Sequence, residues 1–108
     1  MEPTMPSLQQ RLLDCYDAIG VATSRMLQAA RSADWSAFEA RERECRTWME
    51  RIERLGNPAA ALDGAGRRQR MEVLRRVLRD DAEIRELLQP WLGEVERCLH
   101  GRFTARLS

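Results

Sequence analysis

The stretch SLQQRLLDCYDAIGVATSRMLQAAR, residues 7–31, decides the fold of this chain. Its apolar residues recur every three or four positions, which places their side chains on one face of an α-helix. Ser7 precedes Gln10 by three residues, the spacing of a capping box, and predicts where the helix begins. A second apolar row makes the face broad, so we expect this helix to contact two neighbours. The first row comprises Leu8, Leu12, Cys15, Ile19, Ala22, Met26 and Ala30, and the second comprises Leu13, Tyr16, Gly20, Thr23 and Leu27.

A second helix is predicted from Trp35 to about Leu55. Asp34 is its expected N-cap, Gly56 supplies the left-handed residue that ends it, and Pro58 follows. Its apolar face comprises Trp35, Phe38, Glu42, Cys45, Met49 and Ile52.

Glu42 is an acid on this apolar face. One interpretation is a buried acid with a raised pKa. The alternative is an edge position where the carboxylate reaches solvent or pairs with Arg46, four residues later. We favour pairing, with a partner on the first or third helix as a candidate, and leave its identity open.

The chain beyond the second helix is less regular. Residues 56–66 are predicted to form a loop, and Met71, Leu74 and Leu78, with Val77 beside them, mark the face of a third helical arm. Because aspartate favours helix ends over helix interiors, Asp80-Asp81 predicts that this arm is bent or split there.

The last apolar row comprises Ile84, Leu88, Trp91, Val95 and Cys98. Pro90 is expected to kink the helix about one turn back, near Glu86. We expect this helix to end near His100-Gly101, with residues 102–108 as a short tail. The elements predict an all-α fold: an antiparallel bundle of three to four helices in one domain, 1–108, with residues 1–6 as a loose lead-in.

Composition agrees with helices. Ala and Leu supply 13 residues each, whereas the β-branched Val, Ile and Thr together supply 11 of the 108 residues. The net charge of +1 gives no general attraction to nucleic acid or anionic lipid. We see no signal peptide and no stretch apolar enough to span a membrane, and three widely spaced cysteines suggest the cytoplasm.

Catalytic motifs are lacking in the sequence. His100 is the single histidine, and its spacing of two residues from Cys98 turns the two side chains apart on a helix. There is no C-x-x-C, no H-E-x-x-H, no glycine-rich phosphate loop and no lysine. We therefore expect neither an enzyme nor a bound cofactor or metal.

The charges of the third arm are separated along the chain. Residues 67–79 hold six arginines and one acid, and residues 80–86 hold four acids and one arginine. Three interpretations stay open for Arg68, Arg75 and Arg79: a solvated face, the polar rim of an apolar partner groove, or a phosphate-binding strip, in that order of preference.

The aromatic residues suggest where a partner binds. Trp35 and Trp91 lie on predicted core stripes, whereas Trp48 lies beside the stripe on a shoulder shared with Leu55. Such off-stripe apolar residues are covered by the third arm or a second copy of the chain, or they line a groove for a partner helix. The predicted partner-binding residues are Trp48, Leu55, Leu87, Trp91 and Leu92, with Arg68, Arg75 and Arg79 as the rim.

Two stretches resemble a known family. SRMLQAA (24–30) followed by DWSAFEARE (34–42), and VLRDDAEIRELLQPWL (77–92), are similar to the flagellar export chaperones of the FliT type. The resemblance covers most of residues 7–100. It implies a small cytoplasmic helical chaperone of flagellar type III export. Such a chaperone binds the C-terminal segment of the filament-capping protein, prevents its premature assembly, and delivers it through the export ATPase complex.

Two features depart from the family pattern. Only residues 102–108 follow Gly101, so we do not expect the further C-terminal helix that covers the client site in family members. Trp91 stands where a polar or basic residue is expected, and it would enlarge the client groove or seal a homodimer.

Two other functions compete with the client chaperone. The first is a regulatory adaptor that binds the flagellar master transcriptional regulator or the export ATPase and carries no client. The second is a coiled-coil subunit, which is disfavoured because Pro90 and the loop at 56–66 interrupt the heptads.

Overall fold

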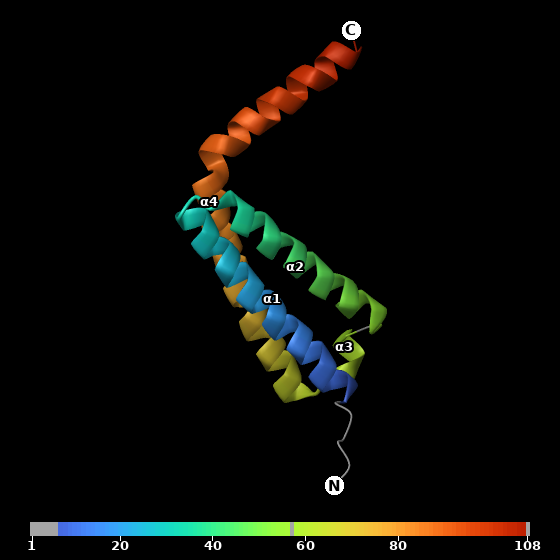
Figure 1. Ribbon diagram of the computed structural model, residues 1–108. Coiled ribbons are helices and arrows are strands. Elements are labelled where there is room, and N and C mark those ends of the chain that lie inside the picture. The colour runs from blue at the N-terminus through green and yellow to red at the C-terminus, as the bar shows by residue number, and fades with distance from the viewer. Residues whose placement is uncertain (1–6, 57, 108) are drawn as a thin grey trace.

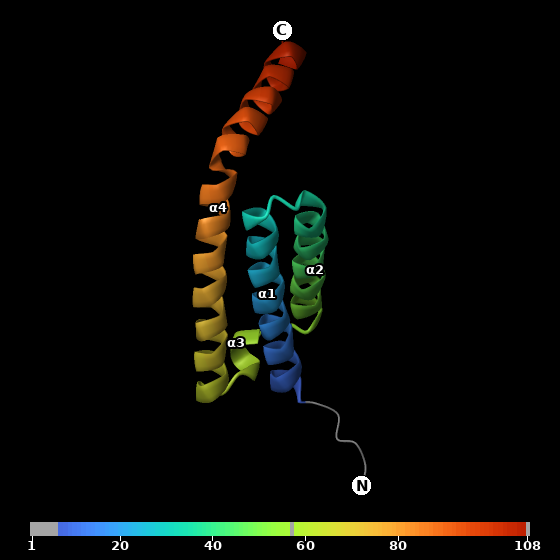
Figure 2. The ribbon, with the colours of Figure 1, turned by 60° about the vertical axis from the view of Figure 1, so that its left-hand side comes forward.

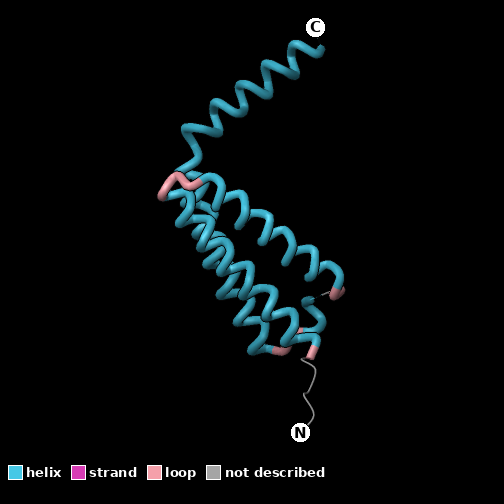
Figure 3. The backbone as a smooth tube through the Cα atoms, viewed as in Figure 1, coloured by secondary structure: helices cyan, strands magenta, loops and turns pink. Residues whose placement is uncertain are grey.

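The computed structural model describes the backbone of residues 7–56 and 58–107, and the side chains of residues 7–56 and 60–90. Over this part the chain forms four helices and no strand: α1 (Leu8–Arg31), α2 (Trp35–Arg54), α3 (Pro58–Ala61) and α4 (Gly64–Leu107). The three long helices run up, down and up, with α1 between α2 and α4 (Figures 1 and 2). Figure 3 shows a short turn between α1 and α2, whereas the connection from α2 to α4 contains the short helix α3. The predicted all-α bundle is confirmed.

Capping hydrogen bonds and a left-handed glycine define the ends of α1 and α2. Ser7 Oγ accepts a hydrogen bond from the Gln10 amide at 3.1 Å, and Asp34 Oδ1 accepts one from the Ala37 amide at 3.1 Å. Gly56 follows α2 with φ of 94°, a conformation that residues with a Cβ rarely adopt. Both N-caps and the glycine at the end of α2 were predicted correctly.

Most of the buried surface belongs to α1. Ten of its residues are buried, whereas Cys45 is the one buried residue of α2. Because α1 packs against α2 on one side and α4 on the other, its broad apolar face has the two neighbours predicted for it. Trp35, expected in the core, is instead 37% exposed, since it starts α2 at the edge of the bundle, against Phe38.

The face by which α4 meets α1 differs from the prediction. Val73 is 3% exposed and lies against Gly20, where an added Cβ would come within 3.3 Å of Val73 Cγ1. Ile84, eleven residues later on the same face, is 4% exposed. Met71 and Leu78, the predicted core residues, are 47% and 67% exposed. The predicted stripe is therefore wrong at Met71 and Leu78, while Leu74 between them is half-buried. Helix α4 is rotated so that a valine enters the close approach that Gly20 allows.

Helix α4 is longer and more continuous than predicted. Residues 58–61 of the predicted loop form α3, and α4 begins at Gly64. The helix runs through Asp80-Asp81 without a break. Asp81 is accommodated inside it by an ion pair with Arg85, one turn later and 2.9 Å away. The third arm is thus bent rather than split, and Figure 1 shows the bend before its red C-terminal end, with Pro90 inside the helix. It passes Gly101 and ends at Leu107, so the expected end near residue 100 is wrong.

The first half of α4 is held to α1 by polar contacts as well as by packing. Arg31 of α1 donates to Glu83 with Nε at 2.6 Å, and Gln69 donates to Asp17 at 3.3 Å. The Arg70 guanidinium lies 5.3 Å from the ring centroid of Tyr16. Within the described residues, no helix is long and apolar enough to cross a bilayer.

Candidate partner-binding groove

Helices α2 and α4 both pack on α1 but make little contact with each other, so a trough lies between them over one face of α1. Part of this trough is an open groove of about 320 Å³. Its floor comes from α1 and its two walls from α2 and α4. The lining residues are Thr23 and Met26 on α1, Glu42, Cys45, Arg46 and Met49 on α2, and Val77, Leu78, Asp81 and Ile84 on α4.

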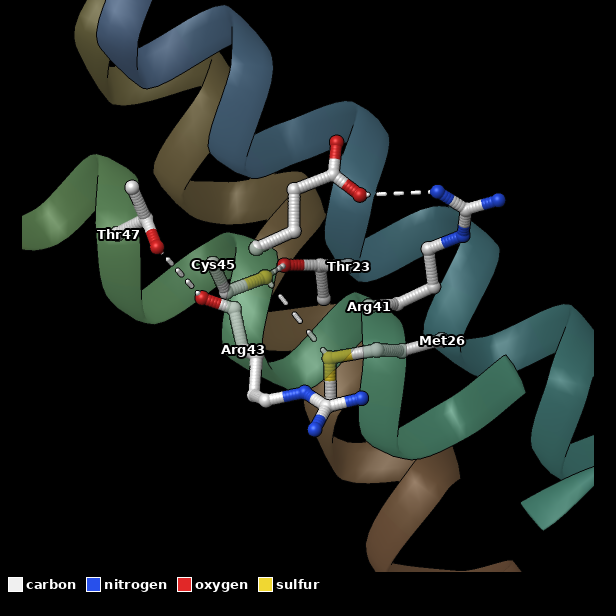
Figure 4. A network of polar contacts seen from close by, with 7 residues as sticks. Thr23, Met26, Arg41, Arg43, Cys45 and Thr47 are labelled. Atoms are coloured by element: carbon white, nitrogen blue, oxygen red, sulfur yellow. Dashed lines mark hydrogen bonds and ion pairs between the residues drawn. The ribbon is translucent and has the colours of Figure 1, made fainter. Parts of the chain in front are cut away.

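The floor carries no polar group in need of a partner. Thr23 Oγ1 donates to the Ile19 carbonyl at 2.8 Å, and Cys45 Sγ lies 3.6 Å from Thr23 Oγ1 and 3.8 Å from Met26 Sδ (Figure 4). Burial raises the pKa of the Cys45 thiol, so its sulfur stays protonated and neutral at physiological pH. The floor and the adjoining Cys45 of the α2 wall therefore present soft, uncharged atoms, which adapt to apolar side chains of different shapes.

Apolar side chains stand exposed on both lips. Met49 on α2 is 50% exposed and Leu78 on α4 is 67% exposed, while Ile84 below them is buried. Large apolar side chains that converge on one groove mark an interaction site more often than scattered exposed residues do. Among the described residues, the groove therefore offers a mainly apolar surface of the kind that binds a partner's apolar side chains, with the neutral thiol of Cys45 in its lining.

The charges at the rim are neutralised within each helix. Arg46 donates to both carboxylate oxygens of Glu42, one at 2.6 Å, and this hydrogen bond holds the pKa of Glu42 below its ordinary value. Asp81 pairs with Arg85 on α4. Glu42 therefore forms the ion pair that we favour for it, and its partner is Arg46 of the same helix, not a residue of the first or third helix. Further along α2, Arg41 donates to Glu44 and Thr47 to the Arg43 carbonyl, both within the helix (Figure 4).

A second cleft, of about 480 Å³, lies on the opposite side of the α1–α4 contact. Charged and polar side chains of Asp17, Arg25 and Arg76 line much of it, and Val21, 50% exposed, is its apolar residue at the surface. It lacks the paired apolar lips of the groove. No cluster of three or more metal-ligating residues is found in the described residues.

Among the described residues, those that the sequence predicts to bind a partner do not line the groove. Trp48 is half-buried with the Arg51 guanidinium 4.4 Å from its ring centroid, and Leu55 packs on the core near α3. Leu87 is 38% exposed on α4. Arg68, Arg75 and Arg79 are exposed on α4, and the side chains of Trp91 and Leu92 lie outside the described residues.

The apolar periodicity of the sequence predicts that the apolar residues of the groove belong to the core. Met26, Met49 and Leu78 each belong to an apolar stripe, and a stripe alone does not show which of its members a neighbouring helix covers. The sequence feature that indicates a groove is the number of apolar residues on the stripes of α2 and α4. These stripes carry more apolar residues than α1 covers, since Met49, Met71 and Leu78 stay exposed.

The fold and the groove define a small all-helical protein with an open, mainly apolar groove between α2 and α4. The family model described as "Flagellar protein FliT" matches residues 13–104. The crystal structure of flagellar protein FliT from Bordetella bronchiseptica is similar, with a TM-score of 0.66 and 31% sequence identity over 81% of this chain and 98% of that chain. Curated proteins give no match. The chain belongs to the FliT family, which confirms the resemblance and implies the general role of a flagellar export chaperone.

Proposed function

We propose that this chain is a cytoplasmic chaperone for the C-terminal segment of the flagellar filament-capping protein. It binds that segment in the groove between α2 and α4 and prevents premature assembly. It then delivers the client to the type III export apparatus through the export ATPase complex. Membership of the FliT family supports the general role.

The observation that carries the proposal is the pair of exposed apolar lips, Met49 and Leu78, on either side of a neutral floor. An amphipathic helix buries its apolar face in such a groove with side chains at positions i, i+3, i+4 and i+7. A segment that assembles through its own apolar face would be kept from assembly while that face is covered. Since the rim charges are already paired, apolar contact supplies most of the affinity.

The test is calorimetric titration of the purified chain with a synthetic peptide of the capping protein's C-terminal segment. Met49→Asp places a charge in the groove, and we expect at least about tenfold weaker binding, which corresponds to about 1.4 kcal/mol. Val21→Asp is the matched control, because Val21 is also 50% exposed but lines the second cleft. The control should bind within about twofold of the intact chain.

Equal weakening by both variants would contradict the groove as the client site. Loss of affinity in Trp48→Ala, with Met49→Asp unaffected, would instead favour the surface predicted from the sequence around Trp48. Binding of the flagellar master transcriptional regulator, without any binding of the capping protein, would favour the adaptor function.

A further inference from the structure

The trough between α2 and α4 continues beyond the open groove, underneath α3. On α1, Leu12 precedes Thr23 by eleven residues, and on α2, Ile52 follows Cys45 by seven, spacings that keep side chains on one helix face. The floor and one wall of the groove therefore extend toward Leu12 and Ile52. There Leu62, which follows α3 and is 3% exposed, packs on Leu12 and Leu13.

We propose that the docking surface includes this covered part, and that an amphipathic client helix displaces α3 and Leu62 from it. The inference rests on the proposed function and names the full extent of the same site. The open part runs along α4 from Val77 to Ile84, about 10 Å or two helical turns. A longer apolar helix face needs the part that α3 occupies.

Helix α3 shows what fits there: a short helical turn followed by one large apolar side chain. Four residues cannot form a stable helix alone, so α3 depends on its contact with the trough. A client helix that covers Leu12, Leu13 and Ile52 replaces the apolar contacts that Leu62 gives up. The cost of the exchange is then the exposure of Leu62 itself to water, which the shorter side chain of Leu62→Ala reduces.

The connections of α3 allow this movement. Gly56, with φ of 94°, lies before it, and Asp63 lies after it. Asp63 Oδ1 accepts from the Gly66 amide at 2.7 Å and so caps α4 by itself, whatever the position of α3. The Gln9 side chain fastens the segment to α1, since Gln9 Oε1 accepts from the Asp63 amide at 2.6 Å and Gln9 Nε2 donates to Asp63 Oδ2 at 3.2 Å.

The test uses Leu62→Ala in the full chain and two synthetic peptides from the capping protein's C-terminal segment. The first peptide spans about two helical turns and the second about six. Leu62→Ala weakens the packing of α3 and residue 62 on α1, so the state in which this part of the trough is open becomes more populated. We therefore expect the long peptide to bind about threefold tighter or more. The short peptide should bind unchanged.

Val73→Ala is the matched control, since it also loses a buried apolar contact but lies at the α1–α4 contact away from α3. It should leave both affinities unchanged. If Leu62→Ala fails to fold, Gln9→Ala serves as a second variant, because it removes both side-chain contacts to Asp63. It should also raise the affinity for the long peptide.

Unchanged or weaker binding of the long peptide to Leu62→Ala, in a folded protein, would overturn this inference and leave the proposed function standing. Failure of both peptides to bind the intact chain would contradict the proposed function and this inference with it. Amide exchange gives a second readout: residues 60–62 should exchange faster in the complex with the long peptide, and slower exchange there would overturn the displacement of α3.

Discussion

Two single substitutions, Val73→Ala and Leu78→Ala, test which face of α4 packs on α1. The structure places Val73 against Gly20 with 3% of its surface exposed, and it leaves Leu78 67% exposed. The apolar stripe through Met71 and Leu78 would predict the reverse. The two residues are close in sequence and on the same helix, so burial is the main difference between them.

The expected magnitudes follow from burial. Val73→Ala removes two buried carbons, worth about 1.6 kcal/mol of transfer free energy, and a small cavity adds to this loss. The higher helix propensity of alanine offsets about 0.5 kcal/mol, so the net loss of unfolding free energy is about 1.5 kcal/mol. Leu78→Ala changes a side chain that is mostly in water, and we expect a change within about 0.5 kcal/mol.

Urea denaturation followed by circular dichroism measures both free energies of unfolding. At a slope of about 1.5 kcal/mol/M, Val73→Ala should lower the urea midpoint by about 1 M, and Leu78→Ala should leave it nearly unchanged. A larger loss for Leu78→Ala than for Val73→Ala would refute the orientation of α4. It would also remove Leu78 from the lip of the groove.

Three further predictions concern the caps and the groove. Hydrogen bonds from the Gly66 amide and the Gln9 side chain hold the pKa of Asp63 below its ordinary value. The contribution of the Asp63 carboxylate to the free energy of unfolding is therefore complete above about pH 4, and it is lost as the pH falls through the lowered pKa. Urea denaturation at a series of pH values should show a smaller loss of stability in acid for Asp63→Asn than for the intact chain. Asp34→Ala removes the cap of α2 and should cost about 1 kcal/mol by the same assay, whereas Asp34→Ser should restore most of it. Hydrogen peroxide should convert Met49 to its sulfoxide, with oxygen transferred to sulfur and water released, and calorimetry should then show weaker client binding. Met49→Leu should lose most of this sensitivity although Met71, 47% exposed, is still oxidised, and Met26 in the same groove accounts for the remainder.

The sequence predicts the elements that depend on local interactions. Ser7, Asp34 and Gly56 mark helix ends because hydrogen bonds to nearby amides and a left-handed residue act within a few positions. Glu42 and Arg46 pair for the same reason, since they lie one turn apart.

The rotation of α4 depends on a residue far away in the sequence. Val73, Val77 and Ile84 overlap with a second apolar series that includes Leu78, and the sequence of α4 does not choose between them. Gly20 on α1 does, because it lets Val73 approach closely. The position of the groove follows from that choice, so it could not be predicted from α4 alone.

The central claim is that a partner helix binds between α2 and α4, and methyl NMR of the complex tests it most directly. With the capping protein's C-terminal peptide bound, we predict intermolecular nuclear Overhauser effects from the methyl groups of Met49, Leu78 and Ile84. Val21, in the second cleft, should give none. Contacts from Val21, with none from Met49 or Leu78, would contradict the account.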